Sequence, residues 1–354
     1  MAQLNHESPW LHFLNRARPV EKLDSDHNTN VLIIGGGIAG ISTAYFLLRH
    51  TSVAKITLVD AGQVAHGASG HNGGIMVTGF EKSFVDLVSE FDLDMASEAQ
   101  REMNTAWELL DDIALHTQIK VPVQKFTGYS ALKTKDQILD QLESNHLKNS
   151  AQLPIMTMLL SEDIEWLSKI PEHYQSLYKL VANQKISELL EVTRTEYIAV
   201  QPIPVGLGNS ALICELIADW MLKFYHDRFE IFENTKINDI VLNQNNSLCY
   251  TDDHHEITTE KVVLCTNGFE DFTVVNNMGP ELDHKLHYLV RGIIGYMAGY
   301  LEPDDHSKQP AAEINYLPNA ATHPMHDLFS EQPYFYVSRR PVIHNDQDYS
   351  LVCL

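Results

Sequence analysis

The stretch VLIIGGGIAG, residues 31–40, decides how this chain folds. Its first four residues are all apolar, which is typical of a parallel strand buried on both faces. The glycine pattern Gly35-x-Gly37-x-x-Gly40 follows, and a helical run then continues to residue 48. A strand, a glycine-rich turn and a helix in this order predict the first half of a dinucleotide-binding βαβ unit.

Each glycine in this pattern has a physical role in holding a pyrophosphate. Gly35 permits the tight turn, Gly37 lets the backbone approach the anion, and Gly40 lets the helix pack on the strand. The free amides at the start of the helix, such as those of Ile38 and Ala39, face the anion together with the positive end of the helix dipole. We therefore expect these five residues to bind the cofactor.

A second apolar run, Ile56–Val59, ends at Asp60. This carboxylate can accept hydrogen bonds from a ribose diol and would repel a 2′-phosphate, which disfavours NADP. Ala61 follows in the same turn. The glycine-dense loop GASGHNGG, residues 67–74, favours FAD over NAD, because it can bring further backbone donors against a long ligand. A glycine turn without a ligand and an NAD site remain the alternatives at this point.

Length and charge exclude other classes of protein. With 354 residues, the chain predicts two domains or one large domain with an insertion. It has 25 Lys and Arg against 47 Asp and Glu, a net charge of −22, which argues against nucleic acid or an anionic membrane surface as a partner. The uncharged run from Val31 to Leu48 is interrupted by glycines and predicts no integral membrane segment.

The sequence offers little to a metal ion or to a secretory route. None of the four cysteines lies near enough to another to form a zinc-ligand pair, and we expect no metal. The run Asp252–His255 is interpreted as a solvated turn. No secretory signal is visible near the N-terminus, so we expect a cytoplasmic protein with reduced thiols.

Apolar periodicity predicts several further elements. The segment of about 84–118 is expected to be helical, with a packed apolar stripe that includes Met95 and Ile113. Asn209 is expected to cap a second amphipathic helix over 210–224. Strands are expected at Phe229–Phe232, Ile237–Leu242, Ser247–Thr251 and Val262–Cys265.

Four segments together resemble a known family: residues 31–40, Asp60, the loop 67–74 and VVLCTNG at residues 262–268. They are similar to the FAD-dependent amine and amino-acid oxidoreductases of the D-amino-acid oxidase family, which includes glycine and sarcosine oxidases. The resemblance is strongest to glutamylputrescine oxidase-like members. It implies an α/β fold, with a Rossmann-like FAD-binding domain of the GR2 type and a mixed α+β substrate domain.

The domain boundaries expected from the resemblance are discontinuous. Residues 1–27 form an N-terminal arm. The FAD-binding domain is expected to comprise residues 28–118, 200–270 and 341–354, and the substrate domain residues 119–199 and 271–340.

The resemblance also implies an activity. Family members transfer a hydride from the carbon next to an amine to flavin N5, which gives an imine and then a carbonyl product with ammonia or an amine. The expected partners are a small-molecule amine or amino acid and oxygen or another electron acceptor. Two alternatives stay open: a truncated or non-catalytic dinucleotide-binding protein, and an NAD-dependent dehydrogenase.

Position by position, the resemblance implies further site residues. The ribityl chain and ring edge of FAD are assigned to Ser69, Asn72, Gly73, Gly74 and Ile75. The phosphate side is assigned to Thr266, Asn267 and Gly268, and a backbone contact with adenine to Ile237.

Substrate positioning is assigned to Arg291, Tyr334 and Tyr336. A buried guanidinium at Arg291 could bind a substrate carboxylate, and an internal acidic partner is the alternative. Packed aromatic rings are the alternative for the two tyrosines. His71 is a weaker candidate for covalent flavin attachment.

One departure from the family concerns the C-terminal end. In the family, a strand like Tyr349–Leu354 leads into a glycine pair and an Asp-Gly-x-Pro-like segment that closes over the flavin. This sequence does not contain that segment. We therefore expect either a fragment or a protein without the flavin-closing piece.

Overall fold

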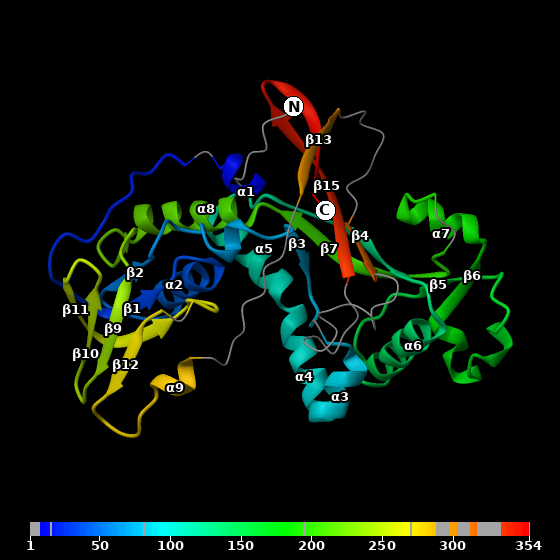
Figure 1. The fold of residues 1–354 in the computed structure, drawn as a ribbon, viewed down its shortest axis with the longest axis horizontal. Helices are drawn as coiled ribbons and strands as arrows, with labels where there is room; N and C mark the ends of the chain where they lie inside the picture. Colours follow the sequence, from blue (N-terminus) through cyan, green and yellow to red (C-terminus); the bar gives the residue numbers. More distant parts are fainter. Residues whose placement is uncertain are drawn as a thin grey trace. The chain divides into compact units, whose positions relative to one another are not determined.

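The computed structural model describes residues 8–14, 16–80, 82–193, 196–269, 271–287, 298–303, 312–316 and 334–353, with the backbone alone at 312–316 and 334–336. The chain forms two compact units, each built from three segments (Figure 1). The first comprises Met1–Asn72, Thr117–Pro122 and Asn209–Tyr296. The second comprises Gly73–His116, Val123–Gly208 and Met297–Leu354.

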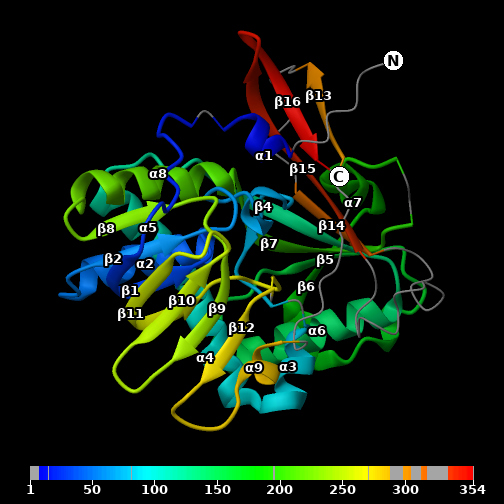
Figure 2. The ribbon, with the colours of Figure 1, turned by 60° about the vertical axis from the view of Figure 1, so that its left-hand side comes forward.

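A seven-stranded sheet forms the centre of the first unit, with the strand order β12-β9-β10-β11-β1-β2-β8 (Figure 2). Its strands are β1 (His27–Ile34), β2 (Ile56–Val59), β8 (Phe229–Phe232), β9 (Ile237–Leu242), β10 (Ser247–Thr251), β11 (Glu256–Leu264) and β12 (Thr273–Asn276). Strands β11, β1, β2 and β8 are mutually parallel, so their carboxyl ends meet at one edge. Open parallel sheets bind ligands at this edge. Here the chain leaves β1 between its neighbours β11 and β2.

Two helices pack on each other and on the parallel strands of the first unit: α2 (Ile38–His50) and α8 (Ser210–Phe224). The cap predicted for α8 is confirmed, because the Asn209 side chain accepts the Leu212 amide. The shorter helices are α1 (Pro9–His12), η1 (Ala68–Gly70) and α9 (Asp283–Leu286). A core that includes Leu32, Val59 and Ile257 is buried within this unit.

The second unit is built on a nine-stranded mixed sheet. Its order is β13-β16-β15-β14-β4-β7-β5-β6, and β3 also pairs with β7. The strands are β3 (Ile75–Val77), β4 (Val123–Leu132), β5 (Met158–Ser161), β6 (Tyr178–Val181), β7 (Ala199–Gly208), β13 (Gly299–Pro303), β14 (Ala312–Tyr316), β15 (Tyr334–His344) and β16 (Gln347–Cys353). The helices are α3 (Phe84–Phe91), α4 (Leu93–Asn104), α5 (Ala106–Thr117), α6 (Lys135–Ser150), α7 (Asn183–Leu190), η2 (Leu167–Lys169) and η3 (Glu172–Leu177). Across the described ranges, no helix of either unit is long and apolar enough to cross a membrane.

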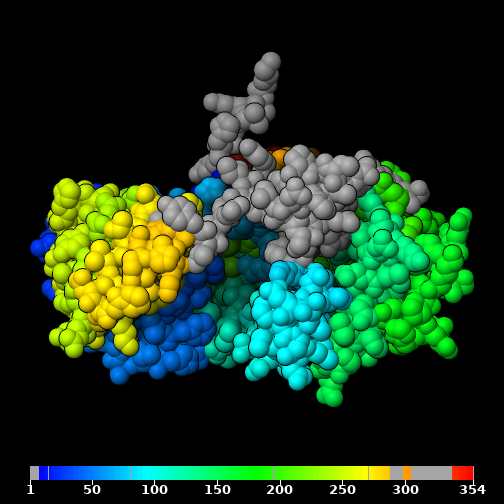
Figure 3. All heavy atoms as spheres, turned by 60° about the horizontal axis from the view of Figure 1, so that its bottom comes forward, coloured from blue at the N-terminus to red at the C-terminus, as the bar shows by residue number. Residues whose placement is uncertain are grey.

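The segment 84–118 is helical as predicted, and it is divided into the three helices α3, α4 and α5. Asp92 has a φ of 93° and ends α3, and its side chain then caps α4 by accepting the Met95 amide at 2.9 Å. Met95 was expected in a packed stripe, yet it is 56% exposed. The cyan segment of the chain, which includes α3 and α4, lies at the surface in Figure 3. Thr105 separates α4 from α5.

The compact units differ from the predicted domain boundaries. Residues 341–354 were expected in the FAD-binding domain, but β16 pairs with β13 and β15 in the sheet of the second unit. Residues 73–116 and 200–208 also belong to the second unit, and residues 271–287 belong to the first. Strand pairing between distant segments, which local periodicity does not reveal, sets these boundaries.

The close packing of α2 on β1 gives a first prediction. A β-carbon at Gly40 would lie 1.9 Å from the Gly35 carbonyl oxygen, so Gly40→Ala must push the helix away from the strand. We expect it to lower the free energy of unfolding by about 3 kcal/mol, measured by thermal unfolding. Gly79→Ala is the control, because nothing lies within 4 Å of its added carbon. A melting temperature for Gly40→Ala equal to that of the control would show that this contact is absent.

Candidate functional site

The turn after β1 brings three backbone segments together. Gly35 has a φ of +110°, and its amide donates to the Val59 carbonyl at 2.8 Å. On its other side, a β-carbon at Gly35 would lie 2.3 Å from the Cys265 carbonyl oxygen. The ends of β1, β2 and β11 therefore meet around a residue that must be glycine.

The first turn of α2 presents its amides beside the second glycine-rich loop. The first amides of a helix have no partner within the helix. The Ile38 amide donates to Ser69 Oγ at 2.9 Å. For Gly37 and Ala39, no amide hydrogen bond is found within the ranges that the structure describes. A β-carbon at Gly37 would meet only the Ser69 side chain, with Oγ at 3.0 Å.

Asp60 is tied to the glycine turn by its carboxylate. Its Oδ2 accepts the Gly36 amide at 2.6 Å, and its Oδ1 accepts the Gly62 amide at 2.8 Å. Burial raises the pKa of Asp60 above its ordinary value, although these two amide hydrogen bonds oppose the rise. Each carboxylate oxygen has a second lone pair, so Asp60 can still accept a hydrogen bond from a ligand hydroxyl.

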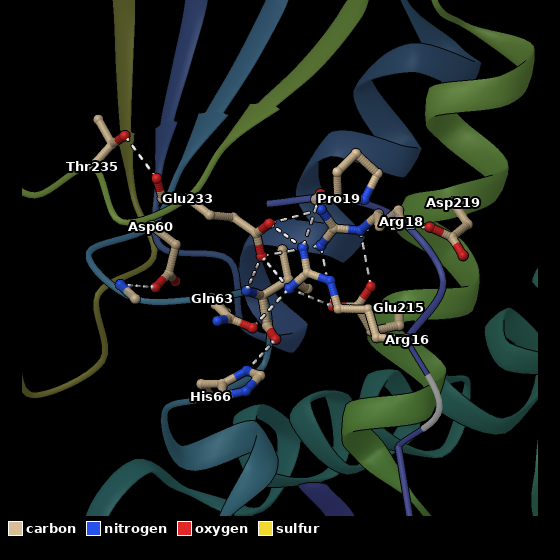
Figure 4. Close-up of polar contacts among 12 residues, drawn as sticks. Arg16, Arg18, Pro19, Asp60, Gln63, His66, Glu215, Asp219, Glu233 and Thr235 are labelled. Carbon is tan, nitrogen blue, oxygen red and sulfur yellow. Dashed lines mark hydrogen bonds and ion pairs between the residues drawn. The ribbon is translucent and has the colours of Figure 1, made fainter. Parts of the chain in front are cut away.

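The loop after Asp60 is fastened to the end of β8 (Figure 4). The Asp60 amide donates to the Phe232 carbonyl at 3.0 Å, and the Thr235 amide donates to the Asp60 carbonyl at 2.8 Å. The Glu233 side chain accepts the Val64 amide at 2.7 Å. Sequence analysis missed Glu233, because its partners lie far away along the chain.

The predicted phosphate-side residues Thr266, Asn267 and Gly268 directly follow β11. The Cys265 amide donates to the Ile34 carbonyl at 2.8 Å, which places this turn beside the glycine turn. Asn267 has a φ of 56°, and the Phe269 amide donates to Thr266. Their contact with a phosphate stays a prediction.

Other predicted cofactor residues are distributed over both units. Asn72 Nδ2 donates to Ser210 Oγ at 2.8 Å and so ties the second loop to α8. Ile237 begins β9 and is buried in the core of the first unit. The remaining three, Gly73, Gly74 and Ile75, belong to the second unit, where Ile75 pairs with Leu207. Ala61 lies in the turn between Asp60 and Gly62.

The predicted substrate residues are described only in part. Arg291 lies outside the described residues. Tyr334 and Tyr336 are two positions apart on β15, paired with Tyr316 and Ile314, and therefore share one face of the strand. Only their backbone is described.

Arg340, also on β15, is a buried cation that sequence analysis did not assign to the site. Its Nη1 donates to the Gly208 carbonyl at 2.9 Å, and its Nη2 donates to the Gly73 carbonyl at 3.2 Å. Burial lowers its pKa to about 10. These contacts fix the backbone of the predicted residue Gly73 within the second unit. The sequence signal that could have revealed Arg340 is an arginine inside a β-strand.

The residues of the first unit fit a bound dinucleotide. Gly35 and Gly40 have no room for side chains, and the amides of Gly37 and Ala39 remain to be satisfied. A carboxylate lies one strand away at Asp60. Amides at a helix start suit a pyrophosphate, and a carboxylate at the end of the second strand suits a ribose. No cluster of side chains suited to a metal ion occurs among the described residues.

Comparison with known proteins agrees with this geometry. Residues 30–183 match the family DAO, which is described as FAD dependent oxidoreductase. The matched segment makes up less than half of the 354 residues of the chain. It contains the glycine turn, Asp60 and the second glycine-rich loop.

Two curated proteins match this chain over shorter stretches. TDA3 of Saccharomyces cerevisiae is 30% identical over 117 residues, 32% of this chain and 22% of that protein. The gamma-glutamylputrescine oxidoreductase of Escherichia coli is 27% identical over 82 residues, 23% of this chain and 19% of the enzyme. The matches therefore span about a fifth of the length of these relatives.

The fold extends the likeness to the rest of the chain. An L-proline dehydrogenase from P. horikoshii superposes with a TM-score of 0.56 and 14% identity, over 93% of this chain and 70% of that one. The predicted fold class is thereby confirmed: an α/β, DAO-like fold with a Rossmann-like FAD domain and a mixed-sheet substrate domain.

Asp60 gives the protein a measurable pH dependence of stability. Its native pKa lies above the ordinary value of 3.8, so between the two values the native protein binds more protons than the unfolded chain. The free energy of unfolding therefore rises as pH falls through the native pKa. Relative to Asp60→Asn, which does not titrate, the wild type should gain stability between about pH 7 and about pH 4 in urea unfolding. A difference between the two proteins that does not change with pH would contradict the raised pKa.

Proposed function

We propose that the chain binds FAD in its first unit and oxidises a C–N bond of an amine or amino acid. The observation that carries the proposal is the meeting of two loops at the start of α2, where Ser69 Oγ accepts the Ile38 amide. A single glycine turn suits NAD and FAD alike. A second loop fixed beside the first offers further donors to the longer ligand.

In this proposal each part of the cofactor is assigned to a different group of residues. Gly35, Gly37, Ile38, Ala39 and Gly40 form the pyrophosphate site, with the amides of Gly37 and Ala39 as its donors, and Asp60 accepts from the adenosine ribose. Thr266, Asn267 and Gly268 bind on the phosphate side, and Ile237 offers backbone to adenine. The ribityl chain and ring edge are assigned to Ser69, Asn72, Gly73, Gly74 and Ile75.

Bound FAD would supply hydride acceptance at N5 from the carbon next to the substrate nitrogen, with oxygen or another acceptor taking the electrons on and water hydrolysing the imine to a carbonyl product and ammonia or an amine. The protein's part is to orient the C–H bond and to favour the neutral amine. Arg291, Tyr334 and Tyr336 are the residues that we propose position the substrate. The names of the E. coli and P. horikoshii proteins, one acting on gamma-glutamylputrescine and the other on proline, support a nitrogen substrate. We also propose a cytoplasmic location, which agrees with four free cysteines.

The cofactor assignment can be tested at Gly37. Gly37→Val directs methyl groups toward the proposed pyrophosphate position, whereas its β-carbon meets only the Ser69 side chain. We expect the variant to fold but to retain less than about a tenth of the wild-type flavin, because a close approach of backbone to phosphate is lost. Flavin is measured by visible absorption after denaturation, with Gly79→Val as the control. Full flavin content in a folded Gly37→Val protein would overturn the phosphate assignment.

The substrate class can be tested by anaerobic reduction of the purified, flavin-loaded protein. Amino acids, N-methylated amino acids and diamines are compared with hydroxy acids of matching carbon skeleton. We expect bleaching of the flavin absorption by one nitrogen class and none by its hydroxy analogue. Bleaching by hydroxy compounds alone would refute C–N oxidation. A colourless protein stabilised against heat by NAD would instead support a dehydrogenase.

A further inference from the structure

The N-terminal arm, here residues 8–24, lies outside the segment 30–183 that matches the DAO family, yet it is firmly packed on the first unit. The Trp10 side chain is 1% exposed, and Leu23 near the other end is 4% exposed. Buried anchors near both ends fix the path of the arm. Its contacts in between reach the loops of the proposed cofactor site.

Two arginines of the arm form a cluster of ion pairs with two buried glutamates, and Arg18 Nε also lies 3.5 Å from Oδ1 of the more exposed Asp219 (Figure 4). Arg18 Nε is 2.9 Å from Glu215 Oε2, and Arg18 Nη1 is 2.9 Å from Glu233 Oε2. Arg16 Nη1 donates to Glu233 Oε1 at 2.8 Å. The Glu233 side chain is 0% exposed, and a carboxylate so buried needs paired charge. The arm supplies that charge.

The same cluster holds the loop that follows Asp60. Glu233 Oε1 accepts the Val64 amide at 2.7 Å, and Arg16 Nη1 donates to Gln63 Oε1 at 3.1 Å. Residues 61–66 are thereby fixed between Asp60 and the second glycine-rich loop.

The start of the arm holds the second loop by separate contacts. The Trp10 indole N–H donates to the Asn72 carbonyl. The Leu11 side chain packs so closely on Gly70 that a β-carbon there would lie 2.9 Å from Leu11 Cδ2. Asn209 Nδ2 donates to the Trp10 carbonyl at 3.0 Å and ties this contact to the start of α8.

We propose that the N-terminal arm is part of the cofactor site, with Arg16 positioning loop 61–66 and Trp10 positioning loop 67–72. The inference rests on the proposed function. That proposal assigns Asp60, which directly precedes loop 61–66, to the adenosine half of FAD, and it assigns Ser69 and Asn72, in loop 67–72, to the flavin half. Loops held in their bound conformation lose less conformational entropy when the ligand binds. Loss of either arm contact therefore weakens the binding of the half of FAD that contacts the corresponding loop.

The experiment measures dissociation constants of FAD and of ADP for the full chain freed of flavin. Arg16→Gln is combined with Glu215→Gln, which removes one charge of each sign from the cluster. Trp10→Phe keeps a buried ring but removes the N–H. Arg228→Gln is the matched control, because Arg228 binds the carbonyls of Leu48, Thr51 and Val53 at the opposite end of β8.

We expect the double variant to bind both FAD and ADP about tenfold more weakly, since ADP contains only the adenosine half. Trp10→Phe should raise the dissociation constant of FAD at least about threefold and leave that of ADP within about twofold of the wild-type value. For Arg228→Gln, the dissociation constants of both ligands should stay within about twofold of the wild-type values. A merely structural role of Trp10 would weaken FAD and ADP by the same factor, and that result would overturn the division between the two loops.

Folding is checked by thermal unfolding of each variant without ligand. Should the double variant not fold, Arg16→Lys replaces it, because lysine keeps the charge but cannot bind Gln63 and Glu233 together. Wild-type dissociation constants in folded arm variants would refute this inference alone. A wild-type protein that binds no FAD would refute the proposed function and this inference with it.

Discussion

The absence of side chains at the turn after β1 is the constraint on which the rest of the first unit depends. Gly40 lies against the Gly35 carbonyl, and Gly35 in turn lies against the Cys265 carbonyl. Any β-carbon at these two positions would separate the helix from the strand or β1 from β11. Because the backbones are this close, helix amides, a carboxylate and a second loop lie within one small region. Chemistry and packing therefore have the same structural cause.

Electrostatics in the first unit differs from the average charge of the chain. The protein carries a net charge of −22, but the cluster of Arg16, Arg18, Glu215 and Glu233 pairs two cations with two carboxylates. Burial raises the pKa of Glu215 more than its arginine partners lower it. Burial also acts on Glu233, but hydrogen bonds from both arginines and from Val64 outweigh it and leave the pKa below its ordinary value. The pKa values of the two carboxylates are thus shifted in opposite directions, and the lowered one belongs to the glutamate that binds the loop.

Local signals in the sequence predict local structure well. The bounds of β8, β9 and β10 agree with the predicted strands, and Asn209 caps α8 as its side chain suggests. The helical segment over about 84–118 was predicted, but its division into three helices was not, because Asp92 both ends one helix and caps the next, and apolar spacing does not reveal such a break.

Contacts between distant segments were the part that the sequence could not reveal. The loops of the candidate site could be named from their glycines, since glycine at fixed spacing has few other causes. Arg16 gave no such signal, because its partner Glu233 lies more than two hundred residues further along the chain. The place of β16 in the second sheet depends in the same way on pairing with β13 and β15.

The pairing of β1 with β11 also bears on how the protein is made. His27 is opposite Ile257, and Ile34 is opposite Leu264, so the strand that carries the glycine turn waits for most of the chain to be synthesised before its sheet can close. Until then β1 has one open edge, and unpaired strand edges promote aggregation. Pairing over so long a distance also slows folding. This topology therefore prolongs the time for which an unpaired strand edge is exposed during synthesis.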